Sequence, residues 1–76
     1  MVEKPHIGKL IKAKLDEQGR KVTWLAKQLN YTRYNIYKIF DNERIDTDLL
    51  IKISLCLDFD FFSFYSDYLK KNNKCL

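Results

Sequence analysis

Residues 22–40 of this 76-residue chain read VTWLAKQLNYTRYNIYKIF. Their apolar positions recur three and four residues apart, which is the spacing of a helix with one buried face. The pattern predicts two short helices, the second beginning near Thr32, whose apolar faces cross. Asn30 stands where the chain must turn between them, and asparagine tolerates a left-handed backbone better than most residues other than glycine. We therefore expect two helices joined by a tight turn.

Two residues just after Asn30 have expected roles in this turn. Tyr31 is expected to tuck its ring into the junction between the helices. Thr32 is expected to cap the second helix, because its hydroxyl can accept a hydrogen bond from the N–H groups of the first turn. The start of the first helix is less defined, since Thr23 could cap it but the pattern favours a cap one or two residues earlier.

One further helix is predicted before this pair. Apolar residues at Ile7, Leu10, Ile11 and Leu15 give a helix that runs to about Gln18. Gly19 is expected to end it as a C-terminal cap.

Two more helices are predicted after the pair. Residues 49–57 form a helix capped by Asp46 or Thr47, and it is apolar nearly all round, so two faces must be covered. Asp60 is expected to cap a last helix over residues 61–70. The sequence thus predicts an all-α fold of five short helices, with one domain over residues 1–70 and a polar tail over residues 71–76.

The length and charge limit the class of protein. A chain of this size forms at most one domain and buries only about 60% of its unfolded surface. The net charge is +4, but Lys4 to Arg44 carries ten basic and four acidic residues, whereas Ile45 to Tyr68 carries five acidic residues and one lysine. This asymmetry suggests one face for a polyanion, the alternative being that both halves are simply solvated.

The two cysteines and the single histidine predict no metal site and no enzyme. Cys56 lies in an apolar helical run and is expected to be a small core residue, while Cys75 lies in the tail. Their spacing does not resemble a metal site, His6 cannot complete one, and there is no nucleophile arrangement or phosphate loop. The polar N-terminus and the lack of a long apolar run predict neither a signal peptide nor a membrane span. A reduced intracellular compartment is expected.

Five positions in residues 22–40 match the helix-turn-helix pattern in order and spacing. A small residue is required where the helices touch, and Ala26 supplies it; the apolar anchors are Leu25, Leu29, Ile36 and Ile39. The chain here resembles the Cro and phage-repressor-like helix-turn-helix family, also called the xenobiotic-response-element family. The resemblance extends from about Ile7 to Phe62 and includes the segments at residues 7–11, 25–29, 32–36 and 50–54.

The resemblance implies a lambda-repressor-like DNA-binding domain and a sequence-specific transcriptional regulator of double-stranded DNA. The helix Thr32–Phe40 would lie in the major groove. There an arginine can pair with guanine and an asparagine with adenine, whereas a tyrosine can meet a thymine methyl group or a phosphate. The implied DNA-binding residues are Lys21, Thr23, Thr32, Arg33, Tyr34, Asn35, Tyr37, Lys38 and Arg44, the last on backbone phosphate.

The chain departs from the family pattern at three positions. Where the family usually has a glutamine that touches phosphate, this chain has Val22, and Lys21 or Thr23 would have to take that role. The usual glycines at the junction and after the second helix are Asn30 and Asn42, both acceptable in a left-handed turn. Plain structural roles also stay open, since Trp24 could cover the core edge and Tyr34 and Tyr37 could pack on the protein itself.

The C-terminal third carries more large rings than the outside of a small monomer can expose. Some must close the core, and the remainder suggests a homodimer through the fourth and fifth helices, as is common in this family; the alternative is that the fifth helix folds back and buries every ring. No cofactor and no small-molecule ligand are expected, because no residues remain for a sensing domain. The resemblance implies a cytoplasmic, nucleoid-associated protein of a bacterium or phage.

A second function stays open beside DNA binding. The same fold could serve as a protein-interaction module, an antitoxin-like or anti-repressor partner, that does not read a groove. The aromatic fifth helix and Val22 favour that alternative. RNA binding is a weaker option, because the chain predicts neither an aromatic sheet nor a glycine-rich clamp loop.

Overall fold

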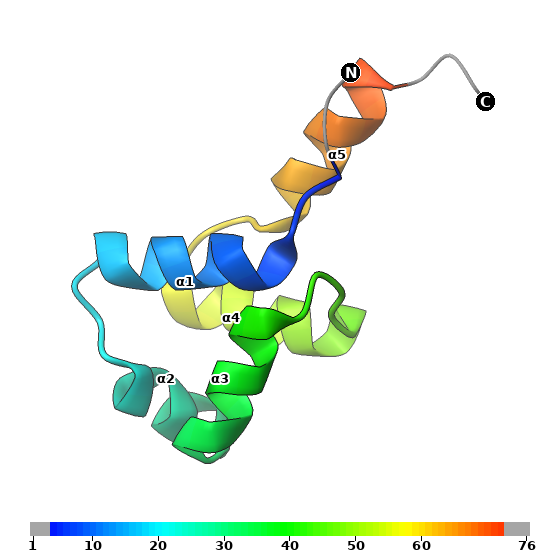
Figure 1. Ribbon diagram of the computed structural model, residues 1–76. Helices are drawn as coiled ribbons and strands as arrows, with labels where there is room; N and C mark the ends of the chain where they lie inside the picture. Colours follow the sequence, from blue (N-terminus) through cyan, green and yellow to red (C-terminus); the bar gives the residue numbers. More distant parts are fainter. Residues whose placement is uncertain (1–3, 73–76) are drawn as a thin grey trace.

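The computed structural model describes residues 4–72, and within that range it contains five helices and no strand (Figure 1). The all-α fold of five short helices is therefore confirmed for this part of the chain. The predicted tail beyond Asn72, with Cys75, lies outside the described residues. The helices are α1 (Ile7–Glu17), α2 (Val22–Leu29), α3 (Arg33–Asp41), α4 (Thr47–Leu57) and α5 (Phe62–Lys71).

Helix α1 begins after His6, whose Nδ1 accepts a hydrogen bond of 3.2 Å from the backbone N–H of Lys9. It ends as predicted at a left-handed Gly19, with φ of 69°. The N–H of Arg20 donates to the carbonyl of Leu15 at 3.0 Å, which satisfies one of the free carbonyls at the helix end. The side-chain amide of Gln18 donates to the carbonyl of Leu57 at 2.7 Å and so ties the end of α1 to the end of α4.

The turn between α2 and α3 has the predicted backbone. Asn30 is left-handed, with φ of 58°, and the N–H of Tyr31 donates to the carbonyl of Ala26 at 2.8 Å. Thr32 caps α3, since its Oγ1 accepts from the N–H of Asn35 at 3.2 Å. The expectation for Tyr31 was wrong: its side chain is 41% exposed, because the buried Leu25 and Ala26 already fill the helix crossing.

Helices α4 and α5 begin close to the predicted positions. Asp46 caps α4 by accepting from the N–H of Leu49 at 3.2 Å, so the helix starts two residues earlier than expected. Asp60 accepts from the N–H of Phe62 at 3.0 Å, so it serves the start of α5 although Phe61 is the residue directly before the helix. Helix α5 extends to Lys71, one residue further than predicted.

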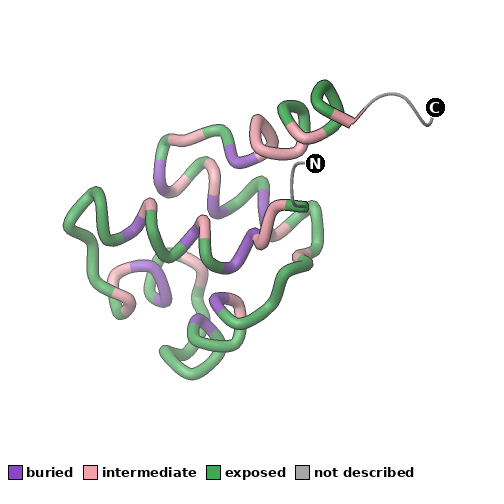
Figure 2. The backbone as a smooth tube through the Cα atoms, turned by 45° about the horizontal axis from the view of Figure 1, so that its top comes forward, coloured by how far each residue is buried: buried purple, intermediate pink, exposed green. Residues whose placement is uncertain are grey.

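The core lies between α1, α2, α3 and α4, where α1 packs against α3, and α2 packs against both α3 and α4. Figure 2 shows the buried positions concentrated in these helices and absent from α5. Cys56 is a free thiol, half-buried against this core. The buried apolar residues are Ile7, Ile11, Leu15, Leu25, Ala26, Ile36, Phe40, Leu50, Ile53, Leu57 and Phe61.

Gly8 is the point where α1 meets the C-terminal end of α3. Its N–H donates to the carbonyl of Asn42 at 3.0 Å. A Cβ added at Gly8 would lie far inside 3.0 Å of three backbone oxygens, those of Ile39, Phe40 and Asn42. The absence of a side chain at Gly8 therefore sets how closely α1 can approach α3, and with it the direction of α3 relative to the core.

Helix α4 is covered on one face only within the chain. Leu50, Ile53 and Leu57 are buried, but Ile51 is 46% and Leu55 is 77% exposed. The expectation that two faces are covered is therefore not met by residues 4–72. Because Ile51 and Leu55 are four residues apart, they form one apolar stripe on the outside of α4.

Helix α5 projects from the other four helices (Figure 1) and has no buried residue of its own. Phe61, directly before it, is fully buried, and its ring lies 4.9 Å from that of Phe59 and 6.3 Å from that of Phe64. The prediction that part of the aromatic set closes the core is confirmed by Phe61. The alternative, that the fifth helix folds back and buries every ring, is not met within residues 4–72, because the rings on α5 are only partly covered.

Candidate nucleic-acid interface

The outer face of α3 carries the predicted polar side chains. Ile36 and Phe40 hold the inner face in the core with Ile39 half-buried beside them, and the opposite side of the helix is open to solvent. Tyr34 is 67% and Tyr37 is 51% exposed, so neither ring is consumed by the core. The exposed polar residues at this end of the pair are Thr32, Arg33, Tyr34, Asn35, Tyr37 and Lys38.

Four of these residues, Thr32, Arg33, Tyr34 and Tyr37, line one open hollow of about 650 Å³ at the N-terminal end of α3. The ammonium of Lys38 lies 4.7 Å above the ring of Tyr34, at a distance where the cation and the ring attract one another. Tyr37 also contacts the protein, since its ring meets that of Phe40 edge-on at 6.3 Å. The α3 surface thus joins cations, hydroxyl groups and aromatic faces at one end of the helix.

Charge is graded along α3. Arg33 and Lys38 stand in the helix, whereas Asp41 ends it and Glu43 follows in the loop. A polyanion is attracted by the first pair and repelled by the second. A phosphate backbone can therefore approach α3 at Arg33 and Lys38 more easily than at the end marked by Asp41.

A second basic hollow lies at the N-terminus of α2. It holds about 420 Å³ and is lined by Gly19, Arg20, Lys21, Thr23, Trp24 and Lys27. Lys21 precedes the helix in an extended conformation, and no side chain caps the first turn. Uncapped N–H groups at a helix N-terminus attract anions. Three cationic side chains, Arg20, Lys21 and Lys27, line the same hollow and add to this attraction.

Val22 stands where the resemblance led us to expect a glutamine that contacts phosphate. The side chain of Val22 is half-buried against the core. Lys21 and Thr23, the expected substitutes, do line the hollow together. The sequence analysis did not select Arg20, whose guanidinium lies 4.3 Å above the indole of Trp24. The sequence pattern that could have indicated Arg20 is Gly19, the expected helix end, followed directly by two basic residues. The Trp24 side chain packs partly against the core, and its indole ring also stacks with the guanidinium of Arg20.

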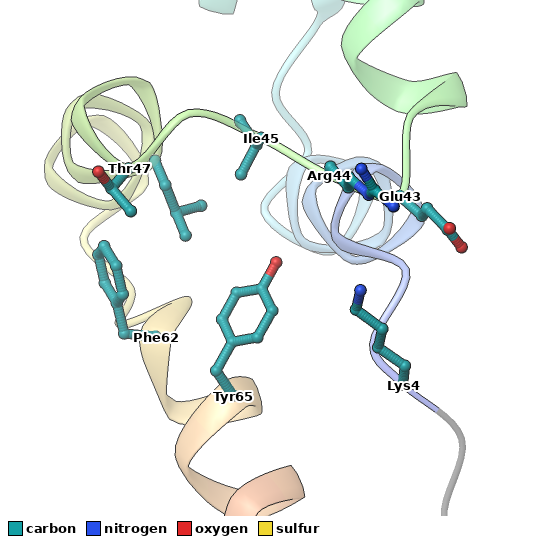
Figure 3. A pocket seen from close by; sticks show the side chains of 8 residues that line it. Lys4, Glu43, Arg44, Ile45, Thr47, Phe62 and Tyr65 are labelled. Carbon is teal, nitrogen blue, oxygen red and sulfur yellow. The ribbon is translucent and has the colours of Figure 1, made fainter.

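Arg44 is separated from the other predicted site residues. It lines a cleft with Lys4, Ile45 and Tyr65 at the base of α5 (Figure 3), away from both basic hollows. The expected phosphate contact of Arg44 stays a prediction, and the structure gives this residue a different set of neighbours.

The cations of α2 and α3 are not paired with carboxylates in the part of the chain that the structure describes. The two ion pairs recorded over residues 4–72 both lie within α1, Lys12 with Asp16 at 3.2 Å and Lys14 with Glu17 at 2.9 Å. Arg33, Lys38 and Lys21 therefore present full charge to a binding partner.

Among the same residues, no three His, Cys, Asp or Glu side chains gather where they could hold a metal ion. None of the described helices is long and apolar enough to cross a membrane. Comparison of the chain with protein-family models, with curated proteins and with solved structures found no match in any of the three.

Proposed function

We propose that this protein is a sequence-specific, double-stranded DNA-binding transcriptional regulator without catalytic activity, in which α2 and α3 form a lambda-repressor-like helix-turn-helix. The observation that carries the proposal is the α3 surface, where unpaired polar and basic side chains stand opposite a fully buried face. The left-handed turn at Asn30 and the cap at Thr32 support it, because together they fix where α3 begins relative to α2. The protein, of bacterial or phage origin, would act in the cytoplasm of the bacterium, on the nucleoid.

Each side chain has a role that its chemistry permits. Arg33 pairs with the O6 and N7 atoms of a guanine, and Asn35 pairs with an adenine. Tyr34 and Tyr37 meet a thymine methyl group or a phosphate, and Lys38 contacts phosphate. The α2 hollow binds a second phosphate through Lys21, Thr23 and the free N–H groups, which fix the position of α3 on the duplex.

Replacing Arg33 by alanine tests the proposed readout. The bound sequence is first selected from a random pool of duplexes, and affinity is then measured by fluorescence anisotropy at several salt concentrations. We expect Arg33→Ala to weaken specific binding by about 1–3 kcal/mol and to relax preference at one base pair, whereas Lys21→Ala weakens all sequences alike and lowers the salt slope by about one. Lys12→Ala, on α1, removes the same charge and should change neither quantity.

Two results would contradict the DNA-binding proposal. One is binding that does not weaken as salt rises, because phosphate contacts release counterions. The other is an Arg33→Ala variant that discriminates sequences as well as the original chain does.

The exposed apolar residues of α4 and α5 support a homodimer. Ile51, Leu55 and Leu69 are large, apolar and at least 46% exposed. Two-fold dimers place their recognition helices about 34 Å apart, one turn of DNA. We expect sedimentation at micromolar concentration to show a dimer that Leu55→Glu converts to a folded monomer. A chain that stays monomeric both free and on DNA would exclude it.

The same helix supports a second candidate function, a protein-interaction module of antitoxin-like or anti-repressor type. Helix α5 has no buried residue and projects from the core, as a segment that docks on another protein would. Gel retardation with random genomic fragments at low salt separates the candidates, since an interaction module gives no retardation.

A further inference from the structure

The cleft at the base of α5 combines an apolar floor with a cationic end. It holds about 440 Å³, within the range of roughly 300–1,000 Å³ that is usual for small-molecule sites. Leu50, Ile45 and Phe62 supply apolar lining, and Leu50 is fully buried beneath it. We call this the Arg44 cleft.

The two cationic side chains of the Arg44 cleft, Lys4 and Arg44, lie on the same side of it (Figure 3). Figure 3 shows Lys4 and Arg44 on one side, Phe62 and Thr47 on the other, and the Tyr65 hydroxyl between them. The carboxylate of Glu43 lies at the outer edge, turned away from Tyr65. In the described residues neither Lys4 nor Arg44 forms an ion pair.

Tyr65 adds a hydrogen-bond donor in the middle of the cleft. Burial raises the pKa of its phenol above the ordinary value, because removal from water disfavours the charged phenolate. A tyrosine hydroxyl is protonated at neutral pH in any case and can donate to an anion, and the raised pKa acts in the same direction.

From this arrangement we propose that the Arg44 cleft binds an amphipathic carboxylate, with the carboxylate on Arg44 and the Tyr65 hydroxyl and the alkyl chain over Leu50 and Phe62. A guanidinium can hold a carboxylate through two parallel hydrogen bonds, which a neutral head group cannot form. The cleft lies inside the helical domain itself, between the loop after α3 and the start of α5.

Titration of the full chain with octanoate, followed by amide chemical shifts, tests the site. We expect octanoate to shift the signals of Arg44, Thr47, Phe62 and Tyr65. Octan-1-ol, which has the same chain without the charge, should bind at least about tenfold more weakly than octanoate. Octylammonium, which carries the opposite charge, should not bind. Inorganic phosphate, which lacks the alkyl chain, should not shift Phe62.

Matched variants locate the two ends of the ligand. Arg44→Gln should weaken octanoate binding about tenfold and leave octan-1-ol unchanged. Thr47→Phe, which fills the apolar end, should weaken both. Lys52→Gln, on the exposed side of α4, removes an equal charge elsewhere and should alter neither. The proposal is overturned by equal affinity for octanoate and octan-1-ol, by an unchanged Arg44→Gln variant, or by shifts that centre on Ile51 and Leu55.

Occupation of the cleft has a consequence for DNA that rests on the function proposed above. If Arg44 also contacts backbone phosphate, bound octanoate competes for the same guanidinium, and DNA affinity should fall about fivefold or more at saturation. Affinity that is unchanged at saturating octanoate excludes this coupling. The titration without DNA judges the cleft by itself, so failure of DNA binding and failure of the cleft are distinguishable.

Discussion

Gly8→Ala should lower the free energy of unfolding by about 3 kcal/mol or more, at the upper end of the range for overpacking a close contact. The new Cβ would collide with the backbone oxygens of Ile39, Phe40 and Asn42, which are not flexible side-chain ends. Alanine is intrinsically favoured over glycine inside a helix by roughly 0.5–1 kcal/mol, so the expected loss is what remains after this gain in helix propensity is subtracted from the cost of the clash. Urea unfolding followed by circular dichroism measures the change.

Gly19→Ala provides the matched control for Gly8. A Cβ at Gly19 meets nothing within 4 Å, but the backbone there has a φ of +69°. We expect this variant to lose only about 1 kcal/mol, from the left-handed backbone alone. If Gly8→Ala proved as stable as the original chain, the close approach of α1 to α3 would be refuted.

Phe61→Ala should lower the free energy of unfolding by about 3–5 kcal/mol, the usual effect of removing a fully buried ring. Phe61 has no exposed surface and packs on Phe59 and Phe64. Helix α5 has no buried residue of its own and meets the core through half-buried rings, so the loss of the fully buried ring beside its first turn should loosen it. Urea unfolding measures the loss, and hydrogen exchange should show the amides of α5 losing protection before those of α1.

Tyr34→Ala is the control for ring removal. Tyr34 is 67% exposed on α3, and its loss should change stability by no more than about 0.5 kcal/mol. Unchanged exchange in α5 of the Phe61→Ala variant would mean that other contacts hold the helix.

Most parts of the fold that depend on neighbours in sequence were predictable, although Asn42 is extended, with φ of -91°, and does not form the left-handed turn considered for it. The left-handed turns at Gly19 and Asn30 and the caps at Thr32 and Asp46 each follow from the chemistry of one residue and the three or four that follow or precede it. The exposed ring of Tyr31 was not predictable in this way, because its burial depends on how the two crossing helices pack and not on the local turn.

The importance of Gly8 illustrates the same limit. In sequence it is a small residue in a helical run, and only the position of the α3 C-terminus beside it makes the absence of a side chain necessary. The ring contacts of Phe61 with Phe59 and Phe64 are likewise tertiary contacts that a helical pattern does not specify.

The candidate site follows the same division. The candidate residues on α3 were named from the family resemblance, and periodicity predicted only that they face solvent, since they lie opposite the apolar positions. The α2 hollow joins the loop after α1 to the first turn of α2, and Arg20 and Trp24 meet across it. Arg44 was grouped with α3 because it follows that helix, but the chain carries it to the base of α5.

The lack of buried residues on α5 also bears on how long a copy of this chain survives. A segment with few buried contacts opens locally at little free-energy cost, and proteases cleave such opened segments. Whatever molecule covers α5 would slow this opening and so lengthen the lifetime of the protein. Solitary copies would then be degraded first, and abundance would rise more steeply than synthesis once enough partners are present.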